Sequence, residues 1–133
     1  MNPRYAAVSH RAIHRCEYCH APEGIFNLPF EVEHVIPLSR DGTDGETNLA
    51  LACRSCNLHK SDQITGIDQM NQQAVRLFHP RQDDWDEHFI VEIETGRVEG
   101  RTEIGRATVA CLSMNEPLQL AARQQWIRLG FYE

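Results

Sequence analysis

The stretch that decides the fold runs from Cys16-Glu17-Tyr18-Cys19 to Cys53-Arg54-Ser55-Cys56-Asn57, and it encloses Glu33-His34-Val35-Ile36-Pro37. Each cysteine pair has the C-x-x-C spacing of a tight turn that presents two sulfurs to one metal ion. Two such turns complete a tetrahedral site of four thiolates, the coordination typical of structural zinc. The sequence therefore predicts that Cys16, Cys19, Cys53 and Cys56 bind zinc and close a loop around a histidine.

The composition is that of one ordinary globular domain. The chain has 133 residues, of which 41% are hydrophobic and 24% are charged. No stretch approaches the roughly 20 apolar residues that cross a bilayer, and the N-terminus lacks the apolar run of a secretion signal. We therefore expect a cytoplasmic protein with no membrane partner, in which cysteines stay reduced and bind metal. Iron in a rubredoxin-like site is an alternative to zinc, because four thiolates also accept iron.

The net charge of −6 disfavours nonspecific adhesion to nucleic acid, yet most of the acidity falls in residues 65–133. Phosphate contacts act within a Debye length of roughly 8 Å at physiological salt, so a local positive surface is sufficient for DNA binding. The candidate residues for such a surface are Arg11, Arg15, Arg54 and Lys60.

The first segment, residues 1–64, is predicted to form two strands and a helix around the cysteines. Residues 30–38 alternate in part between apolar and polar, which indicates a short strand that is ended by Pro37. Residues 39–46 are rich in turn formers and predict an exposed loop. Residues 48–52 return as a second strand, and a short helix follows from the Cys53 turn to Lys60.

The second segment, residues 65–133, is predicted to form packing elements. Residues 67–77 have helical spacing, although a loose connector is equally compatible with them. Residues 89–93 and 97–100 predict a hairpin, and two helices follow, one capped by Thr102 and one opened by Pro117. The predicted fold class is α+β, with a core domain at 1–64 and a C-terminal extension at 65–133 that together form one compact unit.

Three residues in the first segment have the chemistry for phosphodiester hydrolysis. Glu33 and Asn57 offer oxygen ligands of the kind that Mg²⁺ and Mn²⁺ prefer. A neutral histidine such as His34 takes a proton from water near pH 7. Adjacent strand residues point to opposite faces, so Glu33 and His34 can share a site only where the strand is twisted, bulged or at its end.

The residues quoted above, together with Leu38-Ser39, Gly42, Asn48-Leu49-Ala50-Leu51-Ala52 and Lys60, resemble the His-Asn-His (HNH) family of endonucleases. Members of this family share a ββα-metal site, and many carry a zinc ion on four cysteines. The resemblance covers about residues 10 to 64. Asn57 stands where the second histidine usually lies, which makes this a His-Asn-Asn variant. Residues 77–109 also resemble an extension found on short bacterial members.

The resemblance implies a role for each of these residues. It makes His34 the general base and makes Glu33 and Asn57 the ligands of a catalytic Mg²⁺, Mn²⁺ or other divalent ion. Asn48 would brace the loop that orients His34, and Lys60 and Arg54 are candidate phosphate contacts. Hydrolysis of DNA by such a site leaves 5′-phosphate and 3′-hydroxyl ends.

Three function classes follow from the sequence, and the third of them is an iron redox protein that holds iron on the four thiolates. The first is a divalent-metal-dependent DNA endonuclease or nickase that uses a histidine general base. The second is a zinc-stabilised nucleic-acid-binding module without catalysis. A monomer would cut one strand per encounter, whereas a symmetric homodimer could cut both, and the sequence leaves this choice open.

Overall fold

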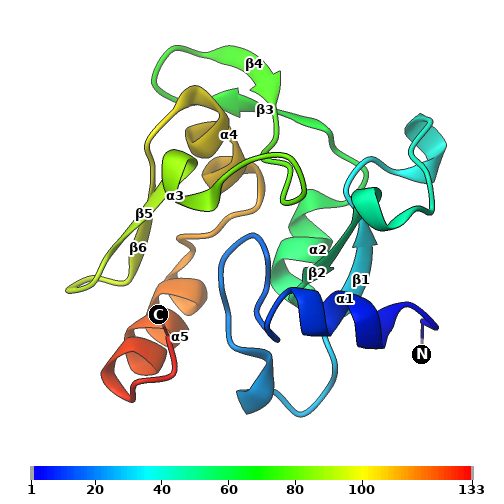
Figure 1. The fold of residues 1–133 in the computed structure, drawn as a ribbon. Helices are drawn as coiled ribbons and strands as arrows, with labels where there is room; N and C mark the ends of the chain where they lie inside the picture. Colours follow the sequence, from blue (N-terminus) through cyan, green and yellow to red (C-terminus); the bar gives the residue numbers. More distant parts are fainter. Residues whose placement is uncertain (1, 133) are drawn as a thin grey trace.

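The fold, seen in a computed structural model that describes residues 2–132, combines helices with separate two-stranded antiparallel sheets (Figure 1). The helices are α1 (Tyr5–Arg11), α2 (Arg54–Lys60), α3 (Trp85–His88), α4 (Glu103–Cys111) and α5 (Pro117–Arg128). The strands are β1 (Glu31–His34), β2 (Leu49–Ala52), β3 (Thr65–Asp68), β4 (Gln73–Arg76), β5 (Phe89–Glu92) and β6 (Arg97–Gly100). Three 3-10 turns are η1 (Glu23–Ile25), η2 (Leu38–Arg40) and η3 (Glu46–Asn48). The predicted α+β class is confirmed.

The central unit is the β1–β2 hairpin with α2 packed against it (Figure 1). The register pairs Glu33 with Ala50 and His34 with Leu49. All four residues of β2 are buried, because the strand lies between α2 and α1 and its Leu-Ala-Leu-Ala sequence is apolar throughout. The strand, loop, strand and helix expected from the sequence are therefore present in this order.

The second half of the chain forms two hairpins and three helices. The β5–β6 hairpin matches its prediction, and so does α4, where Thr102 Oγ1 accepts a hydrogen bond from Gly105 N at 3.0 Å. Pro117 begins α5, as its fixed φ angle favours. Sequence patterns at caps and turns were sufficient to locate these elements.

Several elements differ from the sequence-based expectation, and one of them is the single-turn helix α3, which had no predicted counterpart. Residues 67–77, predicted as a helix or a loose connector, form the β3–β4 hairpin instead. The polar turn between these strands explains the difference, since Asp68 Oδ1 accepts from Met70 N and Asn71 Oδ1 accepts from Gln73 N, both at 2.9 Å. Helix α1 had no predicted counterpart, because residues 5–11 lack a clear apolar stripe.

One continuous buried cluster contains residues from both halves of the chain. Trp85 Nε1 donates to Tyr18 O at 2.8 Å, and Tyr132 Oη donates to Cys19 O at 2.8 Å, so the extension is tied directly to the first cysteine turn. The division at residue 64 remains a prediction. Within residues 2–132, the helices are too short or too polar to cross a membrane.

Candidate active site and metal centre

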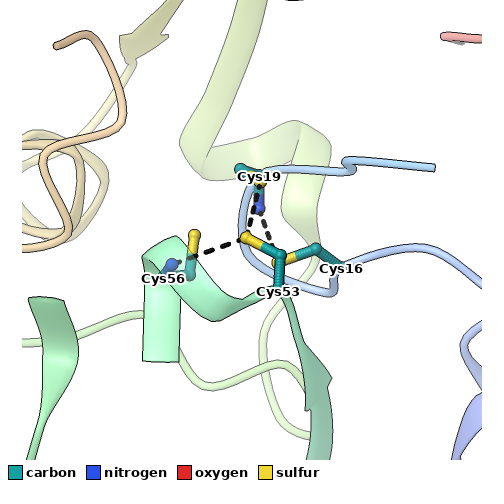
Figure 2. A group of neighbouring side chains, drawn as sticks. All are labelled: Cys16, Cys19, Cys53 and Cys56. Atoms are coloured by element: carbon teal, nitrogen blue, oxygen red, sulfur yellow. Dashed lines mark hydrogen bonds between the residues drawn. The ribbon is translucent and has the colours of Figure 1, made fainter. Parts of the chain in front are cut away.

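The four paired cysteines converge on one point. Cys16 and Cys19 come from the turn that follows α1, and Cys53 and Cys56 come from the start of α2 (Figure 2). All four Sγ atoms lie within 4.8 Å of one another, and all four residues are buried. Cys19 Sγ and Cys53 Sγ are 3.7 Å apart. Four sulfurs at about 2.3 Å from a single ion lie about 3.8 Å from each other, so the spacing fits tetrahedral zinc.

Backbone and electrostatic features support this cysteine cluster as a cation site. Cys19 N donates to Cys16 Sγ at 3.5 Å and Cys56 N donates to Cys53 Sγ at 3.4 Å, contacts that favour negative charge on sulfur. Hydrogen bonds from Cys16, then from the other two thiols, lower the pKa of Cys19. Hydrogen bonds with Cys16, and then with Cys19, raise the pKa of both Cys53 and Cys56. One thiolate forms readily, and several form together only when a cation neutralises them.

His34 lies at the end of β1, with 26% of its side chain exposed. Its Nε2 is 2.9 Å from Asp44 Oδ1, an atom of the loop between the two strands. A carboxylate can only accept, so Nε2 carries the proton in this contact and Nδ1 is the basic nitrogen. Arg4 approaches the other Asp44 oxygen at 3.9 Å. Solvent therefore reaches an imidazole whose tautomer is set by its partner.

Asn48 holds the loop that carries Asp44. Its Oδ1 accepts from Ile36 N at 2.9 Å, and its Nδ2 donates to Ile36 O at 2.9 Å and to Thr43 O at 2.7 Å. Gly42 lets the loop fold this tightly, because a Cβ at that position would meet Ile36 O at 1.8 Å. These contacts fix the loop relative to the end of β1, where His34 lies.

Glu33 points to the opposite face of β1 from His34. It is 6% exposed, its Oε1 accepts from Tyr18 Oη at 2.6 Å, and its Oε2 lies 2.7 Å from Lys60 Nζ. Burial raises the pKa of Glu33, and the Lys60 ammonium opposes that rise. Burial also raises the pKa of Tyr18, so its hydroxyl remains a donor. Glu33 is thus part of a buried ion pair between β1 and α2.

Lys60 is only 1% exposed and also donates to Val35 O at 2.8 Å. Its ammonium group faces the interior of the protein. A phosphate would bind at the solvent-exposed surface, which this group does not reach. Arg54 is exposed and forms no hydrogen bond or ion pair within residues 2–132. Of the two candidate phosphate contacts on α2, Arg54 is therefore the accessible one.

The two residues expected to hold a catalytic cation are in different environments. Asn57 is half-buried on α2, and its amide makes no hydrogen bond to residues 2–132. Glu33 Oε2 has no hydrogen bond of good geometry, which leaves it acceptor capacity. However, Lys60 already supplies the positive charge at that oxygen. Glu33 does not fit a divalent-ion site while Lys60 stays in place.

Asp44 is the residue at this site that sequence reasoning missed. It lies in a turn-rich loop, where an acidic residue is unremarkable by pattern alone. The strand register would have helped, because His34 is the last residue of β1 and the loop must return past it to reach β2.

Comparison with known proteins agrees with these observations. Residues 16–63 match the model of a protein family described as HNH endonuclease. The search against curated proteins and the search against solved structures each find no match. The matched range begins at the first cysteine of the cluster and ends just after α2, so it contains the cysteine cluster, the β1–β2 hairpin and His34. Residues 16–63, which contain the four-cysteine site, are therefore similar to the HNH endonuclease family.

Proposed function

We propose that this protein is a DNA endonuclease or nickase in which His34 is the general base. The observation that carries the proposal is the partly exposed imidazole at the end of β1, hydrogen-bonded to Asp44 within a segment that matches a nuclease family. The β1–β2 hairpin and α2 provide a rigid base for this histidine, because the cysteine cluster ties α2 to the turn after α1.

The chemistry assigned to His34 is proton transfer. Its Nδ1 takes a proton from a water molecule as the water oxygen attacks phosphorus, and the bond from phosphorus to the 3′ oxygen breaks on the opposite side. The departing 3′ oxygen takes a proton from solvent water, so the products are a 5′-phosphate and a 3′-hydroxyl. Asp44 keeps the second ring nitrogen protonated, and Asn48 keeps the Asp44 loop in position.

A divalent ion in such a site supplies positive charge that stabilises the phosphate in the transition state. The side-chain amide of Asn57 makes no hydrogen bond to residues 2–132 and is available as a ligand of this ion. Glu33 becomes available as a ligand only when Lys60 moves away from it. The pairing of Glu33 with Lys60 also favours a second candidate function, a zinc-stabilised nucleic-acid-binding module without catalysis. Cleavage and binding must therefore be measured separately.

A supercoiled-plasmid assay distinguishes the two functions. We expect the wild-type protein to convert the plasmid to nicked or linear forms with Mg²⁺ or Mn²⁺. His34→Ala should lower the rate by roughly 10² to 10⁴, the usual contribution of a general base. His59→Ala is a matched control, since His59 is an exposed histidine on α2. DNA binding without cutting by the wild type, across several divalent ions, would instead support the binding module.

The Asp44–His34 contact gives a separate prediction. Asp44→Asn should lower kcat by roughly two- to fivefold with little change in KM, because an exposed ionic contact is worth at most about 1 kcal/mol. Asp44→Glu should recover part of the loss. The ¹⁵N chemical shifts of the His34 ring should show a proton on Nε2 in the wild type and a mixed tautomer in Asp44→Asn. Identical ring shifts in both proteins would exclude a positioning role for Asp44.

A further inference from the structure

A concave site lies between η1, the start of α2 and α5, beside the cysteine cluster. The cavity has a volume of about 370 Å³. Its walls are mainly apolar and include Ile25, Phe26 and Trp126. Phe26 and Ile25 are each 42% exposed, and the rings of Phe26 and Trp126 are 5.9 Å apart at an angle of 57°. Aromatic surfaces are therefore open to a ligand here.

Polar groups lie among these aromatic walls. Arg54, Ser55 and Gln119 all contribute to the lining. Arg54 is exposed and has no partner within residues 2–132, so its guanidinium is free to bind an anion. These groups match the parts of a nucleotide. The aromatic walls suit the face of a base, the neutral polar side chains suit its polar edge, and the guanidinium of Arg54 suits the phosphate.

The cavity is also continuous with the nuclease domain. Arg54 and Asn57 are three residues apart on α2, and side chains at this spacing are neighbours on a helix surface. A strand whose phosphate contacts Arg54 would therefore run along the helix that carries Asn57. The Trp126 ring also stacks with the ring of Tyr132, at a centroid distance of 6.4 Å and an interplanar angle of 18°. The stacking surface is thus held in place by the fold.

We propose that this cavity binds an unpaired nucleobase of a DNA strand, stacked on Trp126 and Phe26, with the adjoining phosphate held by Arg54. The choice of nucleic acid as ligand rests on the function proposed above. The inference adds a substrate class, since a base can enter the cavity only from single-stranded DNA or after leaving the duplex stack. An apolar peptide would use the aromatic walls but would leave the charge of Arg54 without a partner.

Tryptophan fluorescence tests the proposal without any need for cleavage. His34→Ala protein is titrated, without added Mg²⁺ or Mn²⁺, with an eight-nucleotide thymidine strand and with an abasic strand that has the same phosphates. We expect the thymidine strand to quench Trp126 and to bind more tightly than the abasic one. Because Trp126→Leu and Trp126→Phe lack the quenched tryptophan, the affinities of all proteins are compared by fluorescence anisotropy of dye-labelled strands. Trp126→Leu should weaken thymidine binding about 5- to 150-fold, the equivalent of 1–3 kcal/mol for one stacked base, and Trp126→Phe should restore part of it.

Three further variants keep the test decisive. Ala122 also lines the cavity, and Ala122→Phe fills it without removing Trp126. This variant should therefore weaken thymidine binding even if Trp126→Leu fails to fold. Arg54→Gln should weaken the binding of both strands and reduce the salt dependence of their affinity by the equivalent of about one phosphate contact. Leu118→Ala is the control, because Leu118 is an 81% exposed residue of α5 outside the cavity.

The outcomes separate this proposal from the nuclease function. Equal affinity for the thymidine and abasic strands, unchanged Trp126 fluorescence, or normal binding by Ala122→Phe would each overturn the cavity proposal. None of these results depends on catalysis. A protein that binds the thymidine strand through the cavity but never cuts DNA would contradict the nuclease function alone.

Discussion

Replacing Cys56 by serine is expected to unfold the segment around the cysteine cluster, residues 16–63, and to abolish zinc binding. The sulfur of Cys56 is buried among three others, and the cysteine cluster joins the turn after α1 to the first turn of α2. Structural zinc in small peptides supplies on the order of 10 kcal/mol of folding free energy. The total stability of a domain is only about 5–15 kcal/mol, so losing the metal removes most or all of it.

Circular dichroism melts together with metal analysis measure this effect. Cys111→Ser is the matched control, because Cys111 is a half-buried thiol of α4 outside the cluster and should leave both melting temperature and zinc content close to wild type. A colourless wild-type sample with one equivalent of zinc would exclude the iron alternative. A Cys56→Ser protein that melts like the wild type would show that the cluster is a set of ordinary buried thiols.

Lys60→Met is expected to destabilise the protein by about 3–5 kcal/mol, because it leaves the Glu33 carboxylate buried and uncompensated. Glu33 and Lys60 are 6% and 1% exposed, so water cannot replace the lost ammonium. The double variant Glu33→Gln with Lys60→Met should regain most of the stability, since both charges are then absent. Urea unfolding of the wild type and the variants gives the free energies.

The same variant tests whether Glu33 can bind a divalent ion. If the Glu33 carboxylate accepts a cation once Lys60 is gone, Mn²⁺ should restabilise Lys60→Met but not the double variant. No effect of Mn²⁺ on either protein would assign Glu33 a purely structural role. Wild-type stability in Lys60→Met without added metal would contradict the buried ion pair itself.

The sequence was most informative where the chemistry of a site requires a fixed spacing between residues, as metal binding requires of the two cysteine pairs. Two C-x-x-C turns leave little freedom in how four sulfurs meet, so the cysteine cluster was predictable, and the β1–β2–α2 order followed from Pro37, the loop residues and the Cys53 turn. The β3–β4 hairpin was not predictable in the same way, because Ile67 and Ala74 fit a helix or a strand until the turn at Asp68 and the packing against α4 decide between them.

For the candidate site, the sequence alone determined which residue types were available, and it predicted that the four paired cysteines meet at one point, as they do. Only the tertiary structure decided which partners the other site residues meet. Glu33 and His34 are adjacent in sequence, yet strand geometry sends one inward to Lys60 and Tyr18 and the other outward to Asp44. Likewise, Trp126 lies far from Arg54 in the chain and shares a cavity with it only because α5 packs beside α2 and η1. The spacing of residues along the sequence determines which side chains a single turn can bring together. Contacts between distant segments depend instead on how the whole core packs.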